Sequence, residues 1–143
     1  MTQRTVTLRP TASQEGCTIS ADLEAVTAAE AAAAAIANKK GISITLLDVS
    51  ELVVLTDVFV IASGTSNRHV KSLVEEVERQ LKTSQGRRPL RREGEDHNRW
   101  VLIDYGDIVV HVFDDETRKY YELERLWGDA PRIAFEEEVA VEA

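Results

Sequence analysis

Apolar and polar positions along the chain follow two different periods, and the order of these segments predicts the fold. A helical period over 21–40, reinforced by many alanines, predicts a helix that Gly41 is placed to end. Apolar and β-branched residues over 41–49 and 57–62 predict two strands. The second strand is apolar at nearly every position, which is typical of a central strand buried on both faces of a sheet.

A second helix is predicted from Ser66 or Asn67, either of which is a suitable N-terminal cap, to Gly86. Its apolar residues recur with the spacing of one buried stripe. They are Val70, Leu73, Val74, Val77 and Leu81. The charged segment 87–99 follows, and residues 89–93 within it suit one short strand.

A β-hairpin is predicted next. Two runs rich in β-branched and aromatic residues, 100–103 and 108–113, flank a turn in which Gly106 supplies a positive φ. A short amphipathic helix over 115–127 follows. This order of elements predicts an α/β fold, with a mixed sheet of four or five strands flanked by helices. The passage from the second strand to the hairpin allows a parallel crossover, whereas the hairpin itself is antiparallel.

The length and composition suit one domain with terminal extensions. A chain of 143 residues, of which 43% are hydrophobic, can bury a sizeable core. Residues 21–131 carry the periodic segments and form the expected domain. Residues 1–20 lack periodicity and predict a flexible leader. Residues 132–143 also lack it and are acidic, which predicts a disordered tail.

Charge and cysteine content narrow the class of protein. The net charge of −8 argues against a general nucleic-acid binder, so we expect a basic partner and no direct sequence-specific nucleic-acid binding. The single cysteine, Cys17, excludes an internal disulfide. No apolar run reaches the roughly 18 residues of a membrane span, and the N-terminal segment lacks the apolar middle of a secretory signal. We therefore expect a cytoplasmic protein without a membrane partner.

The sequence contains no complete catalytic or metal-binding motif. The turn 63–69 could hold an anion on backbone N–H groups, but it lacks the known phosphate-binding spacings, and an ordinary capped turn is the alternative. Glu76 and Glu78 have the spacing of paired metal-binding carboxylates. On a helix, residues two apart diverge by roughly 200° and do not easily share a metal. We expect no enzyme activity, no cofactor and no metal.

Four residues of the predicted hairpin are candidates for partner recognition. Trp100 opens the first strand, where a tryptophan is either the edge of a core or an interface anchor. Asp104 and Asp107 flank the turn, where aspartate commonly accepts backbone hydrogen bonds and could alternatively contact a partner or act in acid–base chemistry. His111 lies mid-strand and is expected to be a hydrogen-bonded structural or interface residue rather than a metal ligand.

Two long motifs carry a resemblance to a known family. The sequence DYGDIVVHVF at 104–113 is followed by RKYYELERLWGDAP at 118–131, and TDVFVIASGTSNRHV lies at 56–70. Together they resemble the signature of the bacterial ribosomal silencing factors, also called Iojap-like proteins, over 22–131. The resemblance implies a nucleotidyltransferase-like scaffold, and the missing catalytic carboxylates then argue against that chemistry. The chain departs from the family pattern mainly in its leader and tail.

The resemblance also implies a function. Members of the family bind ribosomal protein 14 of the large subunit and sterically block joining of the small subunit when nutrients are scarce. Assembly of the large subunit is one alternative role, and a nucleotide-binding enzyme of this fold is another. The resemblance further implies a homodimer, formed through the sheet, when the protein is not bound to the ribosome.

The residues expected to contact the ribosomal partner follow from the same resemblance. The family's matching tryptophan is associated with docking, so Trp100 is predicted to be the anchor, while Asp104, Asp107 and His111 supply polar contacts to basic side chains. Tyr105 and Glu93 are further candidates. The predicted contact set is therefore Trp100, Asp104, Asp107, His111, Tyr105 and Glu93.

Overall fold

Helices and strands alternate along the chain in the order that the periodicity predicts. The computed structural model describes residues 21–51, 53, 55–121 and 130–134. Its elements are α1 (Leu23–Asn38), β1 (Ile42–Asp48), β2 (Val58–Gly64), α2 (Asn67–Gln85), β3 (Arg91–Glu93), β4 (Trp100–Asp104), β5 (Ile108–Asp114), α3 (Asp115–Tyr121) and β6 (Arg132–Ile133). Elements from α1 to β5 lie within two residues of their predicted bounds. The helix expected over 115–127 is described as far as Tyr121, and its last part lies outside the described residues.

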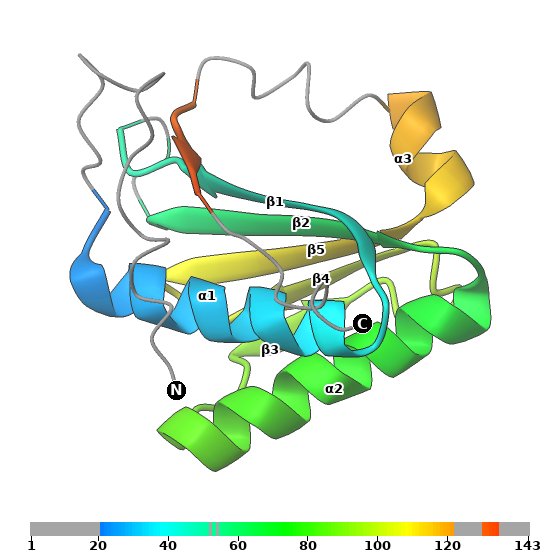
Figure 1. Ribbon diagram of the computed structural model, residues 1–143, viewed down its shortest axis with the longest axis horizontal. Coiled ribbons are helices and arrows are strands. Elements are labelled where there is room, and N and C mark those ends of the chain that lie inside the picture. Colours follow the sequence, from blue (N-terminus) through cyan, green and yellow to red (C-terminus); the bar gives the residue numbers. More distant parts are fainter. Residues whose placement is uncertain (1–20, 52, 54, 122–129, 135–143) are drawn as a thin grey trace, which may run out of the picture.

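The strands form one mixed sheet in the order β3-β4-β5-β2-β1-β6. The pair β2 and β5 is parallel and the other neighbours are antiparallel. Every residue of β2 is buried, which confirms that this strand is central. The α/β class is therefore confirmed, as is the flanking of the sheet by helices (Figure 1).

The sheet has six strands among the described residues, whereas the sequence predicted four or five. The additional strand is β6, in which Ile133 pairs with Leu46 and Arg132 with Leu47. Two residues are too few to display a strand period, so the pattern could not identify them. They also lie at the start of the segment 132–143 that was expected to be a tail, and so at least its first two residues belong to the sheet.

The parallel partner of β2 is β5, and not β3 or β4, which come earlier in the sequence. Strand β2 pairs in parallel with β5 over its full length, from Val58 opposite Ile108 to Gly64 opposite Asp114. Strand β4, which follows α2 and β3, lies on the far side of β5. The crossover from β2 therefore runs through α2 and the outer strands before the chain returns to the centre on β5 (Figure 1).

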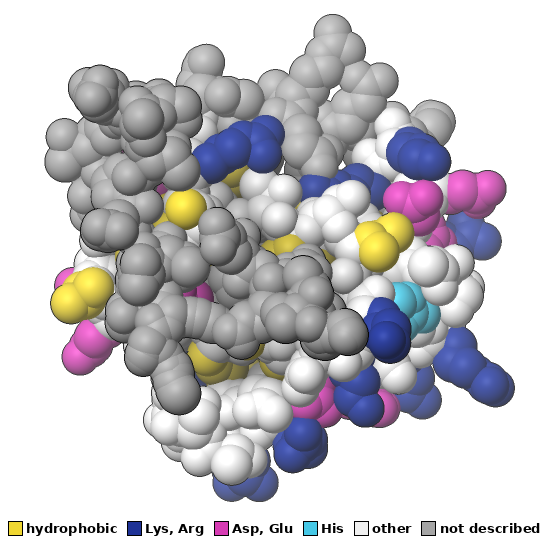
Figure 2. Space-filling view, viewed as in Figure 1, with side chains coloured by type: hydrophobic (Ala, Val, Ile, Leu, Met, Phe, Trp, Pro, Cys, Tyr) yellow, Lys and Arg dark blue, Asp and Glu magenta, His cyan; other side chains and the backbone are white. Residues whose placement is uncertain are grey.

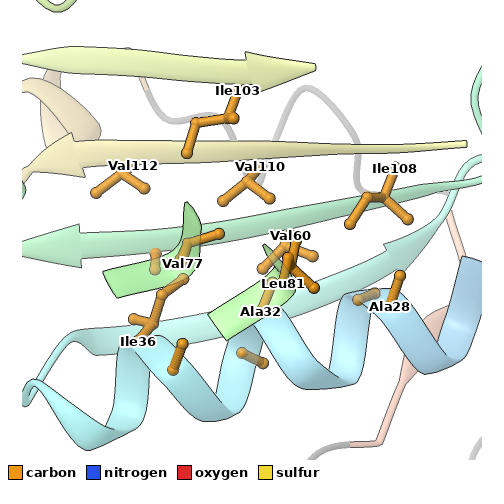
Figure 3. Packing of buried hydrophobic residues seen from close by; sticks show 14 of the residues in the cluster. Ala28, Ala32, Ile36, Val60, Val77, Leu81, Ile103, Ile108, Val110 and Val112 are labelled. Carbon is orange, nitrogen blue, oxygen red and sulfur yellow. The ribbon is translucent and has the colours of Figure 1, made fainter. Parts of the chain in front are cut away.

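Helices α1 and α2 lie side by side over one face of the sheet (Figure 1). Figure 3 shows Ala28, Ala32 and Ile36 of α1 and Val77 and Leu81 of α2 pointing toward the strands. The sheet supplies a set of aliphatic side chains to the same layer. These are Val60, Ile103, Ile108, Val110 and Val112. Alanine has almost no side chain, so the alanine-rich surface of α1 lets this helix approach its neighbours closely, and this explains the alanine run.

The helix ends match the predicted caps, with one difference in detail. The Ser66 side chain accepts a hydrogen bond from the backbone N–H of His69, and Gly86 ends α2 in the left-handed conformation, with φ 65°. After α1 it is Lys40, with φ 66°, that takes the positive φ. Gly41 is needed for space instead, because a Cβ there would lie 2.2 Å from Cγ2 of Ile36.

Candidate functional site

The opposite face of β3, β4 and β5 collects the aromatic and polar residues of the hairpin. Side chains alternate along a strand, so the residues of β4 and β5 that do not face α1 and α2 point to this side. The strand register sets them opposite one another: Trp100 pairs with Phe113, Leu102 with His111, and Glu93 with Leu102. We call this surface the Trp100 face, made of Arg91, Glu93, Trp100, Leu102, Asp104, Val109, His111 and Phe113.

Trp100 is half-buried, and two of the described residues, Phe113 and His111, hold its ring. Its ring stacks on that of Phe113, with 4.8 Å between ring centroids and an angle of 30° between their planes. Its indole N–H donates a hydrogen bond of 3.2 Å to Nδ1 of His111. The indole is thus packed and hydrogen-bonded while the residue remains partly exposed, as an interface anchor requires.

His111 is buried beneath Trp100, with 7% of its surface exposed. Its ring packs edge-on against Phe59, with 4.8 Å between centroids. Burial lowers the pKa of His111 from 6.5 to about 4, so the imidazole is neutral near pH 7. An indole N–H can only donate, so Nδ1 is the acceptor and the proton lies on Nε2. Among the described residues Nε2 has no hydrogen-bond partner.

Asp104 and Glu93 lie at the rim of the Trp100 face. One oxygen of Asp104 accepts a hydrogen bond of 2.8 Å from the backbone N–H of Gly106, which is the turn-stabilising role expected of aspartate. The other oxygen accepts one from Arg91 at 3.4 Å. Arg91 also forms an ion pair with Glu93 at 3.3 Å. Both carboxylates are partly exposed, so they remain within reach of a basic partner.

Tyr105 and Asp107 do not lie on the Trp100 face. Tyr105 is only 4% exposed and belongs to the core cluster under α1 and α2, and burial raises the pKa of its hydroxyl to about 12. Asp107 forms a two-point ion pair with Arg87, at 2.5 and 3.3 Å. Arg87 also donates to the carbonyl of Tyr105 and lies over its ring. These three residues fasten the hairpin turn to the segment that follows α2.

The structure therefore divides the six predicted contact residues. Trp100, Asp104 and Glu93 share one surface and are accessible. His111 lies beneath that surface, Tyr105 is inside the core, and Asp107 is paired with Arg87 at the hairpin turn. Sequence reasoning missed Leu102 and Arg91 as members of the surface. The signal was available, because strict alternation along a strand sets residue 102 on the same side as residue 100. The position of Arg91 depends on pairing between strands, which only the fold reveals.

Helix α3 is fastened to the same side of the sheet by a buried arginine. Arg118 is 5% exposed and donates to the carbonyl of Ser43 at 2.7 Å and to Oγ of Ser63 at 3.0 Å. Ser43 has a positive φ of 53° at an irregularity in the pairing of β1 with β2. The guanidinium group thus satisfies a carbonyl of the irregular strand and links α3 to the sheet.

Charge is unevenly distributed over the described surface. Figure 2 shows Lys and Arg side chains around α2 and the turn between α1 and β1, where Lys39, Lys40, Arg68 and Lys71 are exposed. The loop between β3 and β4, next to Trp100, exposes the carboxylates of Glu95 and Asp96, beside Glu93 of the strand. Arg91 and Arg92 are interspersed among these carboxylates, but each forms ion pairs with acidic side chains.

The residues considered above for nucleotidyltransferase chemistry, Glu76, Glu78 and Gly64, have structural roles. Glu76 accepts hydrogen bonds from Arg79 and Gln80, whereas Glu78 accepts them from Arg92, so the two carboxylates are directed at different partners. Close packing favours glycine at position 64, because a Cβ there would lie 3.1 Å from the backbone nitrogen of Val70. The described residues contain no group of three or more metal-ligating side chains that could hold an ion.

Comparison with known proteins decides the family. The sequence model of the family described as "Ribosomal silencing factor during starvation" matches residues 22–143. The chain belongs to this family. The ribosomal silencing factor RsfS of Bacillus subtilis is 43% identical to it over 100 residues, which cover 70% of the chain and 84% of that relative.

Two further relatives extend the comparison. A crystal structure of a Chromobacterium violaceum protein superposes with a TM-score of 0.70 and 40% identity, covering 74% of this chain and 88% of that one. The mouse protein named "Mitochondrial assembly of ribosomal large subunit protein 1" is 42% identical over 74 residues, which cover 50% of the chain and 32% of the mouse protein. Within the described part of the chain, no helix combines the length and apolar character needed to cross a membrane.

Proposed function

We propose that this protein represses translation by binding the large ribosomal subunit through the Trp100 face. In this proposal the contact is with ribosomal protein 14 of the large subunit, and the bound protein sterically prevents the small subunit from joining, chiefly when nutrients are limiting. The observation that carries the proposal is the half-buried Trp100, stacked on Phe113 and hydrogen-bonded to His111. Blocking of this kind requires neither a cofactor nor turnover.

Physical chemistry favours this surface as the docking site. Tryptophan is enriched among residues that dominate binding energy, and a ring that is already oriented loses little freedom on binding. The Trp100 face lies on paired strands rather than on a loop, so its residues hold fixed positions. The carboxylates of Glu93 and Asp104 on the same face as Trp100 suit the basic surface typical of ribosomal proteins.

The names of the relatives support a ribosomal partner and leave two roles for it. Bacterial relatives are named ribosomal silencing factors, which supports repression. The mouse relative is named for assembly of the mitochondrial ribosomal large subunit, which supports the same partner and a second role in assembly. The two roles differ in when the protein acts: on mature subunits for silencing, or on incomplete ones for assembly.

Sedimentation with purified ribosomal subunits tests the main proposal. We expect the wild-type protein to migrate with the large subunit and to reduce the joined-ribosome peak when the small subunit is added. Replacing the anchor, Trp100→Ala, should weaken binding by about 30-fold, equivalent to the roughly 2 kcal/mol of an interface hot spot. Leu90→Ala is the matched control, since Leu90 is 71% exposed and precedes the neighbouring strand β3.

The outcomes separate the possibilities. Wild-type protein that stays at the top of the gradient while subunits join normally would contradict the proposal. Equal losses for Trp100→Ala and Leu90→Ala would contradict the docking surface but not the partner. Binding without any effect on subunit joining would favour the assembly role, and that role predicts that cells lacking the protein accumulate incomplete large subunits even in rich medium.

We further propose that the protein forms a homodimer through the sheet when it is not bound to the ribosome. A dimer that covers the Trp100 face would compete with the ribosomal partner for the same residues. Sedimentation equilibrium over a range of concentrations measures the dimer. Trp100→Ala should shift it toward monomer if the surfaces coincide, and an unchanged equilibrium would separate the two surfaces.

A further inference from the structure

Among the described residues, two contacts orient the Trp100 indole, and each restricts a different motion of the ring. Stacking on Phe113 fixes the plane of the ring but allows the ring to slide or flip within that plane. The hydrogen bond from Nε1 to His111 is directional and selects one edge of the indole. The bond therefore decides which edge of Trp100 points outward.

His111 is itself unable to turn away from this bond. Its ring packs between Phe59, with 4.8 Å between centroids, and Phe113, to which it lies nearly parallel at 6.3 Å. Leu102 is its cross-strand neighbour on β4. An imidazole buried among apolar side chains presents Nδ1 as a rigid acceptor, because rotation of the ring would require these neighbours to move.

The environment of Nε2, the other ring nitrogen of His111, indicates that packing alone does not explain why a histidine occupies this position. Nε2 is buried and has no hydrogen-bond partner among the described residues. A buried donor without a partner destabilises the folded state. A leucine at this position would fill the site between Phe59 and Phe113 without that penalty, so the gain from the imidazole must come from Nδ1, which accepts the bond from Trp100.

We propose that His111 is a positioning residue for docking: it holds the Trp100 indole in the binding orientation through Nδ1 and does not touch the partner itself. This inference rests on the proposed function, because it concerns the same surface. It differs from the expectation drawn from the sequence, in which His111 contacts basic side chains directly. Burial of the ring rules out that direct role unless the surface rearranges.

A matched pair of substitutions tests the proposal. In His111→Asn the side-chain oxygen occupies the place of Nδ1 and can still accept the bond, whereas His111→Leu has nearly the same shape as asparagine and no acceptor. We expect His111→Leu to weaken binding to large subunits by about fivefold, equivalent to one net hydrogen bond. We expect His111→Asn to remain within about twofold of the wild type.

A direct observation of the indole N–H distinguishes positioning from general loss of structure. In a 15N–1H correlation spectrum the Trp100 indole signal is identified as the one that disappears in Trp100→Phe. We expect His111→Leu to move this signal and to speed its exchange with solvent, while His111→Asn leaves both nearly unchanged. A variant that merely loosened the fold would shift signals throughout the spectrum.

A double-mutant cycle tests whether His111 acts through Trp100, and its Trp100→Phe arm still tests the hydrogen bond if His111→Leu folds poorly. Trp100→Phe keeps the stacking on Phe113 but removes the donor, so it breaks the same bond while leaving His111 in place. We expect this variant to weaken binding, and the combination with His111→Leu to weaken it no further than Trp100→Phe alone. Fully additive losses would contradict the proposal, because they would mean that His111 acts independently of Trp100.

The outcomes also separate this inference from the proposed function. If Trp100→Ala abolishes binding but His111→Leu and His111→Asn both bind like the wild type, the positioning role is overturned and the docking surface stands. If Trp100→Ala binds like the wild type, both fail. If His111→Asn loses as much affinity as His111→Leu while the Trp100 indole signal stays in place, His111 acts by direct contact, and the positioning role is again overturned.

Discussion

The two faces of the sheet are built from the same strands but filled by different chemistry. Strand β5 sends Ile108, Val110 and Val112 toward α1 and α2, and all three are fully buried. From the same strand Val109, His111 and Phe113 point to the Trp100 face. The helix-covered face is aliphatic over most of its area, whereas the Trp100 face combines aromatic rings with a buried imidazole.

This difference suggests that one face of the sheet mainly stabilises the fold, whereas the other face is suited to binding a partner. The helix-covered face follows most expectations for a core, because its side chains are mainly aliphatic and closely packed, although the buried hydroxyl of Tyr105 has no hydrogen-bond partner among the described residues. The Trp100 face departs from those expectations at His111, whose Nε2 is unsatisfied among the described residues, and at Trp100, which is only half-buried. Departures of this kind are expected at functional sites, since function and not stability retains them.

The largest expected effect lies on the helix-covered face. Leu73 of α2 is fully buried, so Leu73→Ala should lower the free energy of unfolding by about 2–5 kcal/mol. Denaturant unfolding followed by circular dichroism measures this loss. The folded fraction of the variant should bind large subunits as tightly as the wild type. Weakened binding by well-folded Leu73→Ala would break the separation of the two faces.

The next largest effect is a pH dependence of stability that comes from His111 on the Trp100 face. The pKa of His111 is lowered by burial from 6.5 to about 4, so the unfolded chain binds more protons than the folded protein between these values. Stability should therefore fall as pH drops from 6.5 to 4, by at most about 3 kcal/mol from this group. His111→Leu should flatten this part of the profile, as measured by unfolding at several pH values. A profile identical to the wild type would contradict the burial of His111.

A smaller effect is expected where α3 joins the sheet. Ser63→Ala removes one acceptor from Arg118 but leaves the 2.7 Å bond to Ser43 intact, so it should cost about 1 kcal/mol. Thr45→Val is the matched control, because the Arg118–Thr45 contact is longer, at 3.4 Å, and its loss should cost less than about 0.5 kcal/mol. Equal costs in chemical denaturation would argue against Ser63 as a principal anchor of this helix.

The smallest effect concerns a charge on the helix-covered side. The hydrogen bond from Arg79 is the main cause that lowers the pKa of Glu76 below its ordinary value of 4.5, partly offset by burial. The stability it contributes is present above that value and is lost as pH falls below it. Because Arg79 is exposed, Glu76→Gln should cost only about 0.5 kcal/mol at pH 7 and should reduce the acid sensitivity below pH 4.5. Acid titration of the unfolding transition checks this.

Much of the fold followed from local patterns. The stripe from Val70 to Leu81, the cap at Ser66 and the turn at Gly106 each depend on neighbours in sequence, and each appears as predicted. Strand β6 and the pairing of β2 with β5 escaped prediction, because both depend on which distant segments meet. The candidate site was found in part: Trp100, Asp104 and Glu93 share a surface, but Tyr105 lies on the other side of the sheet.

The sequence by itself determined the α/β class, the hairpin, the helices and, through its two long motifs, the family. Hydrophobic period, turn chemistry and caps are properties of short segments, and so they can be recognised before the chain folds. Only the tertiary structure decided that His111 is buried beneath Trp100 and accepts a hydrogen bond from its indole. Burial depends on what packs above a residue, and in this sheet that is set by strands and helices far away in the sequence.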